Sequence, residues 1–502
     1  MTDPAVEGPM AASGSAAAER SATASVPKQL RIGPSWRDAS AATGLAVEDP
    51  STGETLAEVA DATPTDGLAA LLAAHHSQAS WALTAPRVRG EILRRAYERI
   101  TADSARLALL ITLEMGKPLA DSLWEVGYAA DFFRWYAEEA VRTDGAYATA
   151  PAGGGRVLTM RQPVGPCLLI TPWNLPLAMA TRKIGAALAA GCTAILKPAE
   201  QTPLTALALT EILLDCGVPE GVLNTVTTSD PGPLVAAVMA DPRLRKVSFT
   251  GSTDVGRILI AQSASQVLRV SMELGGNAPF LVFADADVAA AVEGAVLAKM
   301  RTNGEACTAA NRLYVARDIA DEFTERLTAR LAGMRVGRGT EPGVETGPLI
   351  DAAARGHVDR LVRDAERRGA RVATGGHTMP RAGHFFEPTL LAGVPADALM
   401  LREEIFGPVA PLITFDDEAD VVTAANDTQY GLAAYIYTRD LGRALRVAEQ
   451  LEAGMVALNQ GTVANSSAPF GGIKHSGYGR EGGREGIGDY LAIKYVAISL
   501  PD

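Results

Sequence analysis

Residues that could do chemistry stand in three short segments. Cys307 follows a glycine in NGEACTAANR, and Glu273 precedes two glycines and a proline in ELGGNAP. A cysteine thiolate is a strong nucleophile, and a carboxylate can serve as the base that activates a thiol or a water molecule. Asn174 lies between two prolines in TPWNLP, directly after an apolar run, where its amide could donate hydrogen bonds. Together the three segments contain a nucleophile, a base and a donor.

Each segment also has an ordinary structural interpretation. A cysteine is most often a small buried apolar residue, glycines with a proline are typical of a turn, and an asparagine often caps its own loop. A fourth segment, FTGSTDVG, leads from a strand through Gly251 into a helix at Ser252, and it could hold a pyrophosphate at the helix N-terminus. It lacks the GxGxxG fingerprint. None of the four segments specifies a function by itself.

Parallel strands and helices are expected to position these residues. From about residue 164 short apolar runs alternate with helical patterns, and a second series of this kind extends from about 276 to 460. The alternation is typical of βαβ units, whose parallel sheets bind ligands at their carboxyl edges. Thr63 and Pro64 begin a capping box, so a helix is expected to start there. The predicted fold class is α/β.

The two ends of the chain have other patterns. Residues 1–40 are rich in Ala, Ser, Gly and Pro and offer no apolar face, so they are expected to form a disordered tail. The segment LAIKYVAISL near the C-terminus is typical of a strand.

Composition excludes several classes of protein. The 502 residues include 46 basic and 58 acidic side chains, a formal charge of −12, which repels nucleic acid and anionic membrane surfaces. The four cysteines contain no C-x-x-C pair, so neither disulfides nor a metal site is expected. No apolar run is long enough to span a membrane, and no secretory signal is recognised at the start. These features predict a soluble, cytoplasmic enzyme.

The order of the motifs resembles one known family. From about residue 45 the chain is similar to the aldehyde dehydrogenase superfamily, and within it to the succinate-semialdehyde dehydrogenases. The motifs that carry this resemblance are PWNLP, LKPAE, FTGSTDVG, ELGGNAP, NGEACTAANR, EEIFGP, PFGGIKHSGYGREG and DYLAIKYV.

The resemblance implies an architecture. A Rossmann-type NAD-binding domain would comprise residues 41–145 and 164–275, and an α/β catalytic domain would comprise residues 276–460. A small β oligomerisation arm would comprise residues 146–163 and 484–502, and the protein would be a homodimer or homotetramer.

The resemblance also implies roles for the chemical residues. Oxidation of an aldehyde to an acid would pass through a thiohemiacetal and a thioester on Cys307, with Glu273 as the base that activates water. The Asn174 amide and the Cys307 N–H would stabilise the oxyanion. Lys183 and Glu481 would lie on the path by which protons leave.

A nicotinamide cofactor follows from the same comparison. Lys197 and Glu200 match adenosine-ribose ligands, and Ser252 matches a pyrophosphate contact. A carboxylate at Glu200 favours NAD over NADP, because it accepts from a ribose 2′-OH and repels a 2′-phosphate. The other expected cofactor contacts are Thr171, Pro172, Trp173, Gly251, Glu404 and Phe406.

Two arginines suggest an anionic substrate. Arg182 and Arg301 match the residues that hold the distal carboxylate in the succinate-semialdehyde branch. A surface or interdomain ion pair is the alternative for Arg182. The branch's substrate-binding serine is replaced by Ala464, which leaves Asn465 or Ser466 as substitutes. Phe470 is the remaining expected substrate contact.

Other activities stay open at this level. Glutarate semialdehyde, 2-oxoglutarate semialdehyde or a hydroxylated or sugar-derived aldehyde are alternative substrates. A thiol hydrolase that uses Cys307 and Glu273 is an alternative activity, although it leaves the cofactor motifs without a role. Glu305 replaces the glutamine usual before the cysteine, with no evident effect.

Overall fold

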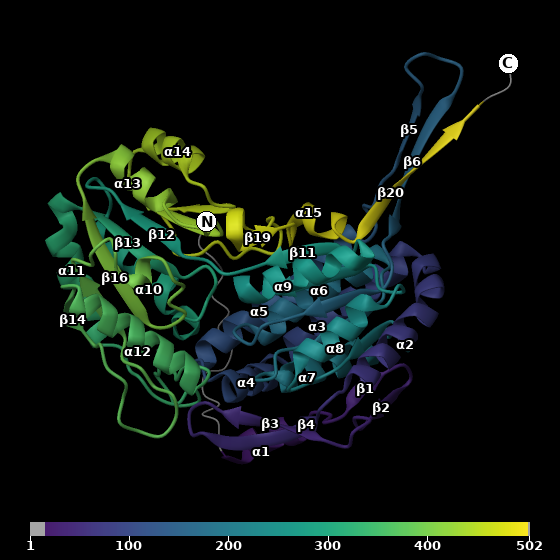
Figure 1. Ribbon diagram of the computed structural model, residues 1–502, viewed down its shortest axis with the longest axis horizontal. Helices are drawn as coiled ribbons and strands as arrows, with labels where there is room; N and C mark the ends of the chain where they lie inside the picture. The colour runs from purple at the N-terminus through teal and green to yellow at the C-terminus, as the bar shows by residue number, and fades with distance from the viewer. Residues whose placement is uncertain (1–15, 500–502) are drawn as a thin grey trace.

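The computed structural model of the chain describes residues 16–499 and contains two α/β units and a projecting β arm (Figure 1). The first unit is built on an eight-stranded sheet in the order β19-β11-β10-β7-β8-β9-β1-β2. Its five central strands are parallel, as the sequence predicts, and the edge strands are antiparallel to their neighbours. The strands are β1 (Leu30–Ile32), β2 (Ser35–Arg37), β7 (Cys167–Ile170), β8 (Ala194–Lys197), β9 (Leu223–Thr225), β10 (Lys246–Thr250), β11 (Arg269–Glu273) and β19 (Gly477–Tyr478).

Helices bury both faces of this sheet. Along β7, Cys167 and Leu169 belong to one hydrophobic cluster and Leu168 and Ile170 to another, as expected of a strand covered on both sides. The predicted capping box is confirmed, because α2 begins at Pro64. The helices are α2 (Pro64–Leu83), α3 (Pro86–Ala102), α4 (Ser104–Met115), α5 (Leu119–Glu139), α6 (Pro176–Ala190), α7 (Pro203–Asp215), α8 (Pro231–Ala240), α9 (Thr253–Ser263) and α15 (Gly483–Gly488), with the short η1 (Ala264–Gln266) and η4 (Lys474–Ser476).

The second unit is built on a seven-stranded sheet in the order β14-β15-β16-β13-β12-β17-β18, parallel except for β14. Its strands are β12 (Ala278–Val282), β13 (Ala310–Ala316), β14 (Arg371–Thr374), β15 (Thr389–Ala392), β16 (Val409–Phe415), β17 (Ala433–Tyr437) and β18 (Met455–Leu458). Its helices are α10 (Val288–Met300), η2 (Arg301–Gly304), α11 (Arg317–Ala332), α12 (Ala352–Arg367), η3 (Leu399–Leu401), α13 (Glu418–Asn426) and α14 (Leu441–Gln450). The α/β fold class is confirmed.

The arm is a three-stranded antiparallel sheet that stands away from both units (Figure 1). Strand β6 (Arg156–Pro163) is central, between β5 (Ala146–Thr149) and the C-terminal strand β20 (Leu491–Ile498). The predicted C-terminal strand is therefore present. A separate hairpin pairs β3 (Gly44–Asp49) with β4 (Glu54–Ala60). No helix of the described residues is long and apolar enough to cross a membrane.

The expectation of a disordered tail over residues 1–40 is wrong for residues 16–40. Residues Ala16–Ala24 form α1, which contacts α4, and Glu19 forms an ion pair with Arg338 at 3.1 Å. Strand β1 joins the first sheet through Arg31, opposite Thr225 of β9. The alanines of α1 and the two short strands pack against the first unit, and the composition of the segment alone does not predict this packing. Residues 1–15 lie outside the described residues.

Strand pairing extends the first unit beyond its predicted ranges. Strands β1 and β2 precede residue 41, and β19 follows residue 460, yet all three belong to the first sheet. The proposed domain boundaries stay a prediction. The site residues predicted from the sequence come from both units and from the segment that returns through β19.

Candidate active site

Cys307 lies in the turn between η2 and β13, on the wall of a pocket of about 400 Å³. Asn174, which follows β7, lines the same pocket. Glu273 ends β11, two strands away from β7 at the same carboxyl edge of the first sheet. The chain then passes Gly276, where a Cβ atom would lie 2.2 Å from the carbonyl oxygen of Cys307, so only glycine permits this close approach. The predicted nucleophile, base and donor are thus brought together between the two units.

The backbone before Cys307 is left-handed at three successive residues. Thr302, Asn303 and Gly304 have φ values of 57°, 58° and 76°. Such a conformation is unfavourable for a β-branched residue and persists only when the surroundings impose it. The Thr302 N–H donates to Asp121 Oδ2 at 2.7 Å, which fixes one end of the turn.

Asn303 fixes the middle of this turn against a distant segment. Its Oδ1 accepts from the Gly347 N–H at 2.7 Å, and its Nδ2 donates to the Pro348 carbonyl at 2.8 Å. Glu305 adds a third bond, because its Oε1 accepts from the Ile350 N–H at 3.0 Å. The segment from Gly347 to Ile350 therefore supports the backbone that carries the thiol.

Asn174 is held by hydrogen bonds on both sides. The side-chain Nδ2 of Asn174 donates to the backbone carbonyl of Glu305 at 2.9 Å. The backbone carbonyl of Asn174 accepts from Lys117 Nζ at 2.9 Å. Lys117 is fully buried and paired with Glu125, whose Oε1 accepts from two backbone N–H groups of the first turn of α6, at 2.8 and 3.0 Å. Neither Lys117 nor Glu125 was predicted, because nothing in their local sequence distinguishes them from surface charges.

Glu273 is a buried carboxyl group without hydrogen-bond partners. It is 2% exposed, and neither oxygen is bonded within the described residues. Burial raises its pKa well above the usual range, and Glu481 adds to this, while Arg182 and Lys183 oppose it. Burial therefore favours the protonated form of Glu273, which has to lose a proton before it can act as a base.

The Cys307 thiol is also held in its protonated form. Burial raises its pKa to about 12, and although Arg182 acts in the opposite direction, Glu404 and Glu273 raise it further. Since the thiolate is the nucleophile, the thiol must lose its proton before it reacts.

Lys183 and Glu481 form a buried cluster with Arg182. Lys183 Nζ donates to Glu481 Oε1 at 2.6 Å, Ser248 Oγ donates to the same oxygen at 3.1 Å, and Arg182 forms an ion pair with the other oxygen. Burial opposes the charge on Glu481, but Lys183 and Arg182 together lower its pKa to about 2. Glu273 lies within electrostatic range of this cluster.

The expected substrate residues divide into two groups. Arg182, Arg301 and Phe470 line the Cys307 pocket, and the Arg182 guanidinium lies 4.2 Å from the Phe470 ring centroid. Arg301 lies 4.3 Å from the ring centroid of Trp124, a pocket residue that the sequence did not single out.

The two proposed substitutes for the missing serine do not line this pocket. Asn465 is exposed and accepts from the Ser467 N–H at 3.0 Å, within its own turn. Ser466 donates to Asp131. Only Ala464 of this turn faces the thiol pocket, so the loop offers no hydroxyl or amide there.

The groups expected to bind the adenosine half of a cofactor lie at the carboxyl edge of the first sheet. Lys197 ends β8 and lies 3.3 Å from Glu200 Oε2, and the Thr171 N–H donates to the Lys197 carbonyl at 3.1 Å, next to Pro172. Ser252 caps α9, and Gly251 joins that helix to β10. The preceding Thr250 hydroxyl is buried without a partner. A helix N-terminus beside an unpaired donor suits a pyrophosphate.

The groups expected to bind the nicotinamide half lie beside Cys307. Glu404 Oε1 accepts from the Gly276 N–H at 3.0 Å, and its other oxygen lies 2.7 Å from the position of a Cβ on Gly275. Phe406 and Trp173 pack edge to face, with ring centroids 5.3 Å apart. These residues fit a ribose ligand and an apolar wall for the nicotinamide ring.

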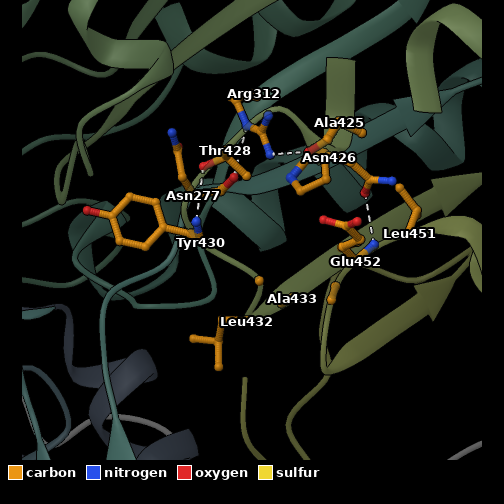
Figure 2. A pocket seen from close by; sticks show the side chains of 14 residues that line it. Asn277, Arg312, Ala425, Asn426, Thr428, Tyr430, Leu432, Ala433, Leu451 and Glu452 are labelled. Carbon is orange, nitrogen blue, oxygen red and sulfur yellow. Dashed lines mark hydrogen bonds between the residues drawn. The ribbon is translucent and has the colours of Figure 1, made fainter. Parts of the chain in front are cut away.

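A second pocket, of about 250 Å³, lies around Asn277 and Arg312 (Figure 2). Arg312 donates to the carbonyl groups of Asn277, Ala424 and Ala425 at 2.8 to 3.1 Å, so its charge serves backbone carbonyls. It connects β12 and β13 to the end of α13. Within residues 16–499 no cluster of His, Cys, Asp and Glu side chains could hold a metal ion.

Known proteins share both the sequence and the fold. A profile of the Aldehyde dehydrogenase family matches residues 36–496. A succinate-semialdehyde dehydrogenase of Paenarthrobacter nicotinovorans is 55% identical over 89% of this chain and 99% of its own length. A glutarate-semialdehyde dehydrogenase of Pseudomonas aeruginosa is 47% identical over 94% of this chain and 97% of its own. The crystal structure of an E. coli NADP-dependent enzyme is 47% identical, with a TM-score of 0.93 over 95% of this chain and 98% of that one.

These similarities confirm the family resemblance inferred from the motifs and overrule the thiol hydrolase alternative. The pocket gives the same answer from its chemistry, since a cysteine, an amide donor and a buried carboxyl group meet beside groups that fit a nicotinamide cofactor. The chain belongs to the aldehyde dehydrogenase family and is an NAD(P)-dependent oxidoreductase that acts on aldehydes.

Proposed function

We propose that the substrate is an aldehyde with a distal carboxylate, with succinate semialdehyde as the first candidate. One observation carries this proposal: Arg182 is 1% exposed, lines the Cys307 pocket, and has an Nη1 atom without a hydrogen-bond partner among the described residues. An unpaired buried donor costs free energy, and a carboxylate is the ligand that fits a guanidinium best.

The ion-pair alternative for Arg182 accounts for only part of its charge. Glu481 pairs with the guanidinium but is shared with Lys183. Burial opposes the charge on Arg182, yet Glu481, Tyr128 and Glu273 raise its pKa, so the guanidinium stays charged. Arg301 adds a second positive charge to the pocket wall.

Cys307 would act as the nucleophile and Asn174 as an oxyanion donor. Sγ would bond to the aldehyde carbon, and the carbonyl oxygen would become an oxyanion that the Asn174 amide and the Cys307 N–H stabilise. When bound, a nicotinamide cofactor would supply the hydride acceptor, and Cys307 would hold the remaining acyl group as a thioester. As a carboxylate, Glu273 would then take a proton from the water that attacks the thioester, which releases the acid and the Cys307 thiolate.

Glu481 and Lys183 would carry that proton onward from Glu273. Their charges are close to Glu273 and already balanced against each other. A proton that arrives at Glu273 therefore has charged neighbours through which it can leave.

We propose NAD as the preferred cofactor, with NADP as the alternative. Thr171, Pro172, Trp173, Lys197, Glu200, Gly251, Ser252, Glu404 and Phe406 would hold it, and Glu200 beside Lys197 would favour a free ribose 2′-OH. The ratio of kcat/KM for NAD and NADP tests this preference. Replacement of Glu200 by Gln should move the ratio toward NADP.

We propose that the arm joins two copies of the chain in a homodimer or homotetramer. Ile493 and Tyr495, two residues apart on β20, are 69% and 61% exposed, which is unusual for large apolar side chains. The four cysteines are free, which suits the reducing cytoplasm.

The substrate proposal is tested by NADH formation with succinate semialdehyde, glutarate semialdehyde, glycolaldehyde and butanal. We expect kcat/KM for succinate semialdehyde to exceed that for butanal by tenfold or more. Replacement of Arg182 by Gln should reduce activity on succinate semialdehyde by about a hundredfold and on butanal much less.

The control is Arg317→Gln, which removes an exposed arginine that pairs with Asp416 far from the pocket. It should leave every substrate unchanged. Equal efficiency of the unmodified enzyme on butanal and succinate semialdehyde would contradict the proposal.

A further inference from the structure

Tyr128 of α5 lines the Cys307 pocket and places its hydroxyl group close to the Arg182 guanidinium. Its ring packs against Trp124 and Phe132, with centroid distances of 5.2 and 4.8 Å. The hydroxyl oxygen is buried and has no hydrogen-bond partner among the described residues. The aromatic neighbours therefore fix the ring and leave the hydroxyl for something else.

The surroundings keep this hydroxyl protonated. Burial raises the pKa of Tyr128 above its usual value, and Arg182 and Arg301 only partly oppose this. At neutral pH the group is an O–H donor beside positive charge. A donor in such a position suits an anion, because the arginines attract the negative charge and the hydroxyl can share it.

The loop at Ala464 gives the pocket no hydroxyl group, and the threonines that line the pocket, Thr302 and Thr308, lie on the segment of Cys307. Ala464 provides a methyl group, and Asn465 and Ser466 are bonded elsewhere. Phe470, Met179 and Leu175 are apolar. A substrate carboxylate has two oxygens with several acceptor positions, and the two N–H groups of Arg182 Nη1 can satisfy only some of them.

We propose that Tyr128 is a specificity-determining residue, whose hydroxyl donates to the distal carboxylate of the bound aldehyde next to Arg182 Nη1. The inference rests on the substrate class proposed above. It assigns the role of the missing serine to a residue of α5, on the side of the pocket formed by Trp124 and Tyr128.

The proposal has a thermodynamic signature that a structural role would not have. An unpaired buried hydroxyl destabilises the free enzyme, so its removal should leave the free energy of unfolding unchanged or slightly higher. The same removal should weaken binding of an anionic substrate. A tyrosine that served the packing alone would show no selectivity between substrates.

The experiment compares Tyr128→Phe with the unmodified enzyme on succinate semialdehyde and butanal. We expect KM for succinate semialdehyde to rise about tenfold, KM for butanal to change less than twofold, and Tm to stay or increase. The rate at which iodoacetamide alkylates Cys307 should not change. The matched control is Tyr437→Phe, a buried tyrosine of β17 outside this pocket, which should affect neither substrate.

Two results overturn the inference, and they differ from failure of the proposed substrate class. If the unmodified enzyme prefers succinate semialdehyde and Tyr128→Phe keeps that preference, Tyr128 does not bind the carboxylate and the substrate class stands. An equal loss on both substrates assigns Tyr128 to the thiol or to packing. If the unmodified enzyme itself shows no preference, the substrate class fails, and the inference with it.

Discussion

Burial raises the pKa of both reactive groups of the site. The pKa of Cys307 is raised to about 12, and that of Glu273 well above its usual range. Deprotonation of the thiol is therefore a separate step that the resting pocket opposes. Glu404 contributes to this opposition, although burial raises its own pKa to about 7, so that it becomes negative only above neutral pH.

The residue-scale prediction concerns the pH dependence of thiol alkylation without cofactor. The pKa of the thiol is about 12, so at any pH well below 12 its thiolate fraction increases tenfold for each unit by which the pH rises. The rate of alkylation by iodoacetamide should therefore rise about tenfold per pH unit from pH 7 to pH 10. Glu404→Gln removes a negative charge and should raise the rate severalfold above pH 7. The adjacent Glu403→Gln, at an exposed residue paired with Arg360, is the control. A rate that levels off below pH 8 would contradict this account.

At the scale of elements, the site depends on segments that are distant in sequence. Asn303 and Glu305 tie the turn before Cys307 to residues 347–350, and Lys117 ties Asn174 to α5 through Glu125. A left-handed turn at a threonine is unfavourable by itself, so these bonds must impose it. The position of the thiol is a property of the packing between elements.

The element-scale prediction compares two asparagines, each with a positive φ and two side-chain hydrogen bonds to the backbone. Asn303→Ala removes two hydrogen bonds from the left-handed turn, so it should lower the free energy of unfolding by about 2 to 4 kcal/mol and kcat roughly tenfold or more. Asn459 also has a positive φ, of 53°, and exchanges two hydrogen bonds with Thr438, at 3.0 and 2.9 Å. Asn459→Ala should reduce stability but leave kcat per folded site unchanged. An equal effect of both variants on kcat would show that the turn does not position Cys307.

The sequence predicted those features of the fold that depend on residues close together along the chain. The βαβ alternation, the helix start at Pro64 and the C-terminal strand follow from local periodicity and capping. The motif order located Cys307, Glu273 and Asn174, which the fold brings together. Lys117, Glu125 and Tyr128 could not be predicted, since their roles depend on contacts across the fold and on an absent hydrogen bond. For the same reason, the prediction of a disordered tail was wrong at α1, because the contact of α1 with α4 cannot be recognised in the local sequence.

At the scale of the whole molecule, the arm is the feature that the single chain leaves unexplained. Its two outer strands have free edges, and the described residues provide no cover for the apolar side chains of β20. Antiparallel pairing places Ile493 opposite Arg161 and Tyr495 opposite Thr159, so both point to one face of the arm.

The prediction at this scale is that Ile493→Asp with Tyr495→Asp reduces the mass measured by light scattering to that of a smaller assembly or a monomer. Charges at the centre of an apolar contact oppose association by several kcal/mol. Leu83→Asp changes an equally exposed apolar residue at the end of α2 and should not alter the mass. An unchanged mass of the double variant would remove the arm from the proposed interface.

The return of the chain through β19 also sets an order of events during synthesis. Gly477 pairs with Glu273, and Phe470 bridges to Glu481, which completes the surroundings of the thiol. Phe470, Gly477 and Glu481 follow all strands of both large sheets except β19, to which Gly477 belongs. A nascent chain can therefore form most of its core while Cys307 still lacks Phe470 and the charges at Glu481. The pocket around the thiol is complete only after the segment that follows β18 has packed against the first unit.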